Sequence, residues 1–201
     1  MKPIRTGKLV VAVSGASGAI YAQRFLRQAV SVFEDVYLIL SRQAVQVATT
    51  ELGCEAFDRP FMPEKWLGVA ASNLKLLDSS DYFTPPASGS FRHDGMVVIP
   101  CSMGTLGRIA NGISDDLLTR SADVCLKERR PLVVVPREMP YNLIMLRNMT
   151  QLAEAGAVVI PASPAWYGKP TSLEELADTV VARVLQTLGV EQQIVRQWMI
   201  E

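Results

Sequence analysis

Short apolar runs alternate in this chain with longer stretches whose apolar residues recur every three or four positions. Each run is too short for a helix and is rich in valine, isoleucine or leucine, which is typical of a strand buried on both faces. Strands that alternate with helices predict an α/β fold of three layers around a parallel sheet, with right-handed crossovers. The predicted strands are Leu9–Val13, Val36–Leu40, Leu74–Leu77, Met96–Cys101, Leu132–Val135 and Ala157–Pro161.

The stretches between these runs predict the helices. One is expected to begin near Ile20, and others to span Gln43–Leu52, Tyr141–Ala155 and Leu173–Leu188. A further helix should have Ser114 as its N-terminal cap, with two aspartates in its first turn and basic residues in its last turn, which complements the helix dipole. The basic residues of that last turn are Lys127, Arg129 and Arg130. Glu55–Leu67 has no clear period and predicts a loop or a short surface helix.

Composition indicates one domain, 1–201, without a nucleic-acid or membrane partner. The 20 basic residues balance 20 acidic ones, so charge gives no reason to expect nucleic acid. No apolar run approaches the roughly 18 residues that span a bilayer. The run after Met1–Lys8 is too short for a signal peptide, so a cytoplasmic location is expected. An apolar share of 49% and the apolar tail at Val190–Glu201 indicate contacts between subunits.

The turn after the first run has the composition of an anion-binding site. Ser14-Gly15-Ala16-Ser17-Gly18 links a strand to a helix, an arrangement that directs backbone N–H groups and the positive helix end at a ligand. Gly15 and Gly18 permit close approach of a phosphate, and the two serines add hydroxyl donors. A plain tight turn is the alternative. A mononucleotide fits better than a dinucleotide, because the three-glycine spacing is absent and the second strand ends in Ser41-Arg42 instead of an acid.

A second turn of small residues, Ser102–Thr105, follows the Met96–Cys101 run. Parallel sheets bind ligands where the strand order reverses, so the two turns predict one ligand across such a switch point. The Asp81–Ser90 loop carries Tyr82 and Phe83 and is expected to contribute to the same site.

Residues after the later runs point to an anionic substrate. Arg137 and Glu138 follow one predicted strand and Tyr167 follows the next, so Arg137 and Tyr167 should converge near the two turns. Arg183 lies within an apolar helix face, where it either joins the site or extends its charge to solvent. Several cations around one pocket favour an anionic ligand.

Two further cations, Arg120 and Lys127, lie seven residues apart and therefore on nearly one face of a helix. An exposed stripe of ion pairs that includes Asp123 explains the same spacing. The three cysteines are far apart in apolar surroundings, as buried reduced thiols are; they are Cys54, Cys101 and Cys125. With one histidine, His93, in a polar loop segment, the chain offers neither a zinc site nor a histidine-dependent triad.

Several motifs together resemble the flavin prenyltransferases of the UbiX type. They are GASGAIY, PPASGS, PCSMGTL, RSADVCLKERRPLVVVPREMP, PASPAWY and VARVL, which run over nearly the whole chain. The resemblance implies a flavodoxin-like fold, assembly as a homododecamer, and transfer of a dimethylallyl group from dimethylallyl phosphate to reduced FMN, with release of phosphate. It also implies that a UbiD-type decarboxylase receives the product, prenylated FMN.

The same resemblance assigns residues to roles. Those expected to bind FMN are Gly15, Ala16, Ser17, Ser41, Ser102, Met103, Gly104, Thr105 and Arg137. Those expected to bind dimethylallyl phosphate, some donated by neighbouring chains, are Ser88, Gly89, Arg120, Lys127, Arg137, Tyr167 and Arg183. Those expected to take part in catalysis are Ser17, Glu51, Lys127, Glu138 and Tyr82, with Glu51 behind Ser17 in a proton relay near flavin N5. Tyr82 departs from the family, which often has tryptophan there.

The chemistry expected of these residues needs no metal, because four cations could stabilise the phosphate that leaves an allylic carbon. Three alternatives remain. A flavin-dependent decarboxylase of the cysteine-peptide type relies on a histidine near the flavin, a role open to His93. A non-catalytic flavin carrier and a direct aromatic-acid decarboxylase are the other two.

Overall fold

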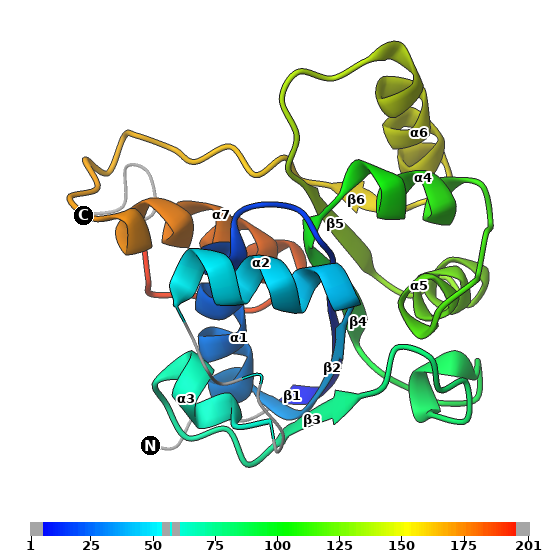
Figure 1. Cartoon of the computed structure of the whole chain (residues 1–201), viewed down its shortest axis with the longest axis horizontal. Coiled ribbons are helices and arrows are strands. Elements are labelled where there is room, and N and C mark those ends of the chain that lie inside the picture. Colours follow the sequence, from blue (N-terminus) through cyan, green and yellow to red (C-terminus); the bar gives the residue numbers. More distant parts are fainter. Residues whose placement is uncertain (1–5, 54–56, 58–60, 196–201) are drawn as a thin grey trace.

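Six parallel strands form one sheet within the described residues, 6–53, 57 and 61–195, of the computed structural model (Figure 1). They are β1 (Thr6–Val13), β2 (Phe33–Leu40), β3 (Leu74–Leu77), β4 (Gly95–Cys101), β5 (Leu132–Pro136) and β6 (Val158–Val159). The strand order is β3-β2-β1-β4-β5-β6, and neighbouring strands are parallel. The order reverses between β1 and β4, so the C-terminal ends of these two strands form the switch point.

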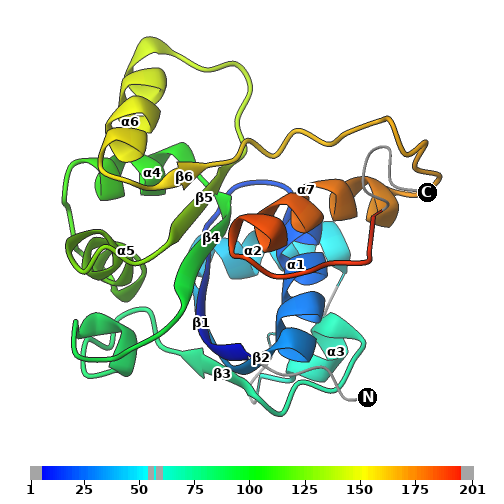
Figure 2. The same cartoon turned by 180° about the vertical axis from the view of Figure 1, so that it is seen from behind.

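Helices cover both faces of the sheet, which gives the three predicted layers (Figures 1 and 2). One layer contains α1 (Ala19–Val32), α2 (Arg42–Leu52), α3 (Pro63–Leu67) and α7 (Leu173–Thr187). The other contains α4 (Met103–Ala110), α5 (Leu117–Lys127) and α6 (Leu143–Glu154). A 3₁₀ turn, η2 (Pro85–Ala87), contacts α5.

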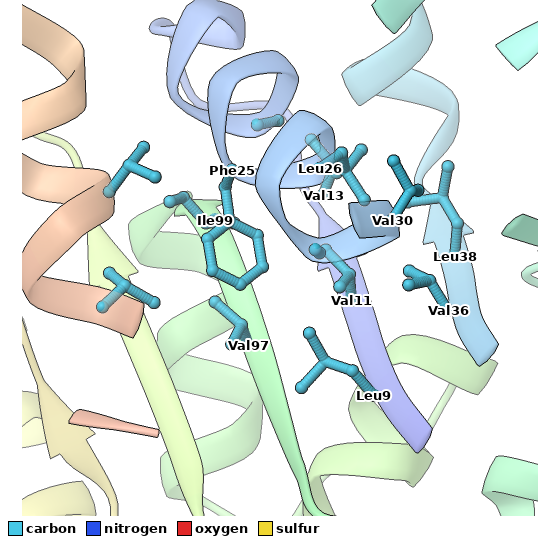
Figure 3. Close-up of a cluster of buried hydrophobic side chains, with 14 of the residues drawn as sticks. Leu9, Val11, Val13, Phe25, Leu26, Val30, Val36, Leu38, Val97 and Ile99 are labelled. Atoms are coloured by element: carbon cyan, nitrogen blue, oxygen red, sulfur yellow. The ribbon is translucent and has the colours of Figure 1, made fainter. Parts of the chain in front are cut away.

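The alternation of side chains along each strand divides the core in two. Leu9, Val11 and Val13 of β1 face α1, where they pack with Phe25 and Leu26 (Figure 3). The residues between them in β1 belong to the cluster under α4 and α5. These side chains are almost fully buried, and each such burial stabilises the fold by about 1.5–3 kcal/mol.

The predicted strands and most predicted helices are confirmed, but one strand is shorter than expected. The prediction was Ala157–Pro161, and the strand is Val158–Val159. β6 lies at the edge of the sheet, and Pro161 has no N–H to donate. One backbone hydrogen bond to β5 lies beyond the end of β6, since Ile160 N donates to Val134 O at 2.9 Å.

The helix that was expected to begin at Ser114 begins later. Its cap is Asp116, which accepts from Thr119 N at 2.7 Å while the Thr119 hydroxyl and Asp116 N lie 3.2 Å apart. This reciprocal pair is a capping box, and it fixes the start of α5. The helix ends at Lys127, so Arg129 and Arg130 lie beyond its last turn.

The 55–67 segment and the C-terminal tail differ from what the sequence predicts. Trp66, on the expected surface segment, is 1% exposed, because α3 folds its aromatic face onto the core. Val190 and Ile194 of the apolar tail pack against the core of their own chain, whereas residues 196–201 lie outside the described part.

Candidate functional site

A cleft of about 630 Å³ opens at the switch point, above the C-terminal ends of β1 and β4. Its walls come from the turn after β1, the start of α2, the start of α4 and the loop before α5. The lining residues are Gly15, Ser41, Arg42, Gln43, Ser79, Ser102, Gly104, Thr105, Arg108, Asp115 and Asp116. Five of the residues predicted to bind FMN therefore meet around one cavity: Gly15, Ser41, Ser102, Gly104 and Thr105.

Two helices begin at this cleft. Ser41 caps α2 and accepts from Ala44 N at 3.0 Å, and Ser102 caps α4 and accepts from Thr105 N at 3.3 Å. The remaining N–H groups of each first turn have no partner within their helix, and the positive ends of both helix dipoles lie beside the cavity. The two serine turns thus create a place that favours an anion.

Ser14 does not act as the hydroxyl donor that the sequence suggested. Its side chain is buried, donates to Pro100 O at 3.1 Å and accepts from Ser102 N at 2.7 Å. The hydroxyl thereby fastens the end of β1 to the end of β4. Its role is to fix the two turns that border the cleft.

Glu51 occupies the N-terminus of α1, which the sequence had assigned to a ligand. One carboxylate oxygen accepts from Gly18 N at 2.9 Å and from Ala19 N at 2.7 Å. Partial burial raises the pKa of Glu51, but the Ser17 hydroxyl, these two N–H groups and the charge of Arg137 together lower it. Gly18 and Ala19 are therefore not available to a phosphate. The contact between Ser17 and Glu51 agrees with the predicted relay.

Arg108 is a cleft residue that the sequence analysis missed. Its Nη1 lies 2.6 Å from Asp115 and 3.0 Å from Asp116, and its Nη2 donates to Thr105 Oγ1 at 3.4 Å. The i, i+3 spacing from Thr105 on one helix is the signal that would have revealed it. Arg108 neutralises part of the negative charge that the two aspartates bring to the cleft.

Tyr82 lies at the border of this charged group. It is 41% exposed, and its hydroxyl donates to Ser114 O at 3.1 Å. Partial burial raises the pKa of the phenol, and the Asp116 and Asp115 carboxylates raise it further. The hydroxyl therefore remains protonated at neutral pH and holds the ring in place.

Four of the residues predicted for dimethylallyl phosphate gather where the 84–91 loop meets α5. Arg120 Nε donates to Ala87 O at 3.2 Å and its Nη1 pairs with Asp123 at 3.0 Å. Lys127 forms an ion pair with Glu128. A Cβ added to Gly89, next to Ser88, would lie 2.8 Å from Lys127 Nζ. The predicted ion pair between Arg120 and Asp123 therefore exists. Arg120 nevertheless also contacts the loop, through Ala87 O.

The other predicted donor contacts lie elsewhere on the chain. Arg137 is exposed at the end of β5, and its charge acts on Glu51 of α2. Glu138 is half-buried and accepts from Met139 N at 3.0 Å. Tyr167 is 80% exposed, and the segment between β6 and α7 that carries it runs to the side of the molecule opposite α5 (Figures 1 and 2). Arg183 is exposed on α7. The expected convergence of Arg137 and Tyr167 on the cleft is not seen, since neither residue lines it.

Two cysteines and the histidine are structural. Cys101 and Cys125 are buried, and burial raises the pKa of each thiol to about 12, so neither is a nucleophile. Cys54 lies outside the described residues. His93 lies in the predicted polar loop segment before β4, but its ring is half-buried: its Nδ1 lies 2.9 Å from Gly95 O and the ring stacks on Phe91.

Sequence comparison identifies the family. The sequence model of the Flavoprotein family matches residues 2–185. The flavin prenyltransferase UbiX of Pseudomonas aeruginosa is 43% identical over 195 residues, which are 95% of this chain and 93% of the relative. The chain belongs to the flavin prenyltransferase family. The predicted family and enzyme class are thereby confirmed.

Solved structures of flavin prenyltransferase relatives agree with the fold. AnUbiX, crystallised in complex with FMN and dimethylallyl pyrophosphate, has a TM-score of 0.83 and 38% identity, with 96% of this chain and 98% of that chain covered. A dodecameric FMN-dependent UbiX-like decarboxylase from Escherichia coli O157:H7 has a TM-score of 0.84 and 37% identity, with 96% and 99% covered. The predicted flavodoxin-like α/β fold is confirmed.

The described part of this member of the flavin prenyltransferase family contains neither a cluster of metal ligands nor a membrane-spanning helix. Among residues 6–53, 57 and 61–195, no three or more His, Cys, Asp or Glu side chains come together as a metal would require. None of the helices in these ranges combines the length and the apolar character needed to cross a bilayer.

Proposed function

We propose that this chain transfers a dimethylallyl group from dimethylallyl phosphate to reduced FMN in the cytoplasm, and that a UbiD-type decarboxylase receives the prenylated FMN. The observation that carries the proposal is the cleft at the switch point, where two capped helix N-termini meet five of the residues predicted for FMN. A relative of 38% identity was crystallised with FMN and dimethylallyl pyrophosphate, which supports both ligand classes.

The residues of the cleft fit FMN. A single phosphate group suits the space between the starts of α2 and α4, because each helix contributes N–H groups and a positive dipole end. Arg42 and Arg108 add positive charge, and Asp115 and Asp116 oppose any further anion there. Met103 and Ala16, next to lining residues, are 7% exposed and anchor their turns in the core. The site thus favours a mononucleotide phosphate over the diphosphate of a dinucleotide.

The flavin ring supplies two nucleophilic atoms, N5 and C6, when reduced FMN is bound. Ser17 would face N5, with its hydroxyl oriented by the Glu51 carboxylate. Because the pKa of Glu51 is lowered, this carboxylate is ionised at neutral pH and keeps the Ser17 proton directed toward itself. The pair can pass a proton to or from the ring edge without moving the backbone.

The donor reacts by breaking its allylic C–O bond, and the electron pair leaves with the phosphate. Arg120 and Lys127 would stabilise the growing negative charge beside Ser88 and Gly89, in a pocket that the Arg137 and the flavin of a neighbouring chain complete. Tyr167 and Arg183 are exposed, and the segment before α7 and α7 itself, which carry them, lie away from α5 (Figure 1), so we assign both residues to the pocket of a neighbouring chain. The dodecameric relative from Escherichia coli supports a homo-oligomer in which such sharing occurs. Cations in these positions make the transfer independent of a metal.

The carbon fragment needs a wall that excludes water and tolerates positive charge. Tyr82 lies near Asp115 and Asp116, which line the cleft, and its ring face would serve as this wall, with the bond to Ser114 O fixing the ring. Bond formation at C6 releases a proton. Glu138, half-buried at the end of β5, would accept this proton, as could the departing phosphate.

The decisive experiment incubates the chain anaerobically with reduced FMN and dimethylallyl phosphate, followed by mass analysis of the flavin. We expect an added five-carbon group in the wild type, about a hundredfold lower rate in Glu138→Gln, and normal FMN binding in both. An unmodified flavin in the wild type would refute the proposal.

The same preparation distinguishes the alternatives. Aromatic acids added without a partner protein test direct decarboxylation, because the relative from Escherichia coli is named a decarboxylase. FMN binding without turnover of any substrate would indicate a carrier. A donor series of monophosphate and diphosphate shows which form the cations prefer.

A further inference from the structure

We propose that Arg130 is a positioning residue that holds the Ser88–Phe91 loop against Lys127. The inference rests on the proposed function, because this loop and Lys127 are the expected binding site of the donor phosphate. Arg130 itself lies beyond the end of α5 and was expected only to complement the helix dipole.

The guanidinium of Arg130 binds the loop through its backbone. Nη1 donates to Phe91 O at 2.7 Å and Nη2 donates to Gly89 O at 2.6 Å. Arg120 Nε donates to Ala87 O at 3.2 Å. Alternate carbonyls of the loop are thus held by two arginines that flank Lys127 in the sequence. A charged donor to a carbonyl makes a strong hydrogen bond, and two parallel donors also fix direction.

The loop backbone at Gly89 lies very close to the Lys127 ammonium group. A Cβ on Gly89 would lie 2.3 Å from Glu128 Oε1 and 2.8 Å from Lys127 Nζ. No other residue fits there without displacing the ion pair. A small movement of the loop would therefore change the distance between Lys127 and any phosphate bound at Ser88 and Gly89.

The end of α5 directs Arg130 toward the loop. Arg129 N donates to Leu126 O at 3.1 Å and Arg130 N donates to Cys125 O at 2.9 Å, which is the Schellman pattern. Arg129 occupies the left-handed position of this motif with φ 55°, where glycine is usual. The strain is borne at Arg129, and the next residue turns back over the loop. Arg130 is half-buried in consequence.

The test compares Arg130→Lys and Arg130→Met with Arg129→Lys, a neighbouring exposed arginine, as the matched control. Lysine keeps the charge but cannot make two parallel bonds, so it separates positioning from simple attraction of the donor. We expect the KM for dimethylallyl phosphate to rise about tenfold in Arg130→Lys, as the loss of a charged hydrogen bond predicts, and further in Arg130→Met. The FMN dissociation constant and kcat should change less, and Arg129→Lys should resemble the wild type.

Hydrogen exchange gives a measurement that does not depend on turnover. The amides of Ser88, Ser90 and Phe91 are hydrogen-bonded within the loop, and they should exchange faster in both Arg130 variants than in the control. If the wild type does not prenylate FMN, faster exchange still supports the loop contact while the proposed function fails. Unchanged exchange would overturn the proposal even if KM rises, since Arg130 would then act on the donor directly. A parallel rise of KM and of the FMN dissociation constant would overturn it as well.

Discussion

One cleft lies at the C-terminal ends of the strands, here called the C-terminal edge, and another at their N-terminal ends, the N-terminal edge. The polar groups of the two clefts have different partners. The cleft at the C-terminal edge has about 630 Å³ and the one at the N-terminal edge about 460 Å³. Both contain arginines and aspartates. The residues around the N-terminal cleft are Gly7, Lys8, Arg92, His93, Asp94 and Arg130.

At the N-terminal ends of the strands, Asp94 and Arg130 are bound to the chain's own backbone. Asp94 accepts from Lys8 N at 2.6 Å, and Arg130 donates to two loop carbonyls. At the C-terminal edge, two helices begin beside the cavity and direct N–H groups toward it. A cavity with charged walls is therefore not sufficient for a site. The direction of the backbone dipoles distinguishes the two edges.

Paired glycine substitutions give the largest expected difference between the edges. A Cβ on Gly15 would lie 2.4 Å from Gln43 Cβ, and neither atom can move without its backbone. Gly15→Ala should push apart the two turns of the cleft and weaken FMN binding by about 1–3 kcal/mol, or roughly fivefold to 150-fold, as overpacking does. Quenching of flavin fluorescence measures this change.

Gly7→Ala is the matched control at the other edge. Its Cβ would meet Asp94 Oδ2 at 1.9 Å, the far end of a side chain that can rotate away. We expect lower stability in urea and an unchanged FMN dissociation constant. If Gly15→Ala and Gly7→Ala lose the same FMN affinity, the C-terminal cleft is not the specific binding site of FMN.

Ser14→Ala should have the next largest effect, on stability. The substitution leaves Ser102 N without its buried partner, whereas Pro100 O keeps its bond from Ser14 N; an unpaired buried donor destabilises by about 2 kcal/mol. Urea unfolding measures the loss, and Ser31→Ala, which removes an exposed hydroxyl bonded to Gln28 O, is the control. A change near that of the control would show that water replaces the Ser14 hydroxyl.

Local patterns were sufficient to predict the sheet and the border of the cleft. Gly15, Ser41 and Ser102 each lie within two residues of the end of an apolar run, and the C-terminal ends of parallel strands lie on the same side of the sheet. The positions of strands depend on periodicity over a few residues, so the sequence shows them. Ser114 and Asp116 lie two positions apart, and both residue types are favourable N-terminal caps. Only the reciprocal hydrogen bonds between Asp116 and Thr119 show that α5 begins after Asp116.

Contacts between distant residues could not be predicted in the same way. Glu51 reaches Gly18 across 33 positions, and Ser14 reaches Ser102 across 88. Each of these contacts changed the role assigned to a turn residue. The predicted donor residues show the same limit, because Arg120 and Lys127 share a helix, whereas Tyr167 and Arg183 belong to the donor pocket only under the proposed sharing between chains.

His93→Gln should have a smaller effect, confined to mildly acidic solution. Burial lowers the pKa of His93 below its usual 6.5. Below pH 6.5 the unfolded chain therefore binds more protons than the folded one, and the free energy of unfolding decreases as the pH falls through the folded pKa. His93→Gln should unfold with a flatter pH dependence between pH 7 and pH 5, roughly the range in which histidine titrates. It should also prenylate FMN normally; loss of activity would favour the histidine-dependent decarboxylase.

Arg129→Gly should have the smallest effect, and it should be stabilising. The left-handed position of Arg129, with φ 55°, is unfavourable for a residue with a Cβ by roughly 1–2 kcal/mol. Glycine relieves this strain but gives the unfolded chain more freedom, which opposes folding by about 0.4–1 kcal/mol. The net gain is about 0.5 kcal/mol in urea unfolding. Lys169→Gly, at φ 51° in an exposed turn, should gain a similar amount. If Arg129→Gly gains nothing while Lys169→Gly does, the greater freedom of glycine at position 129 has weakened the contacts of Arg130 with the loop, and the left-handed turn at Arg129 is what directs Arg130.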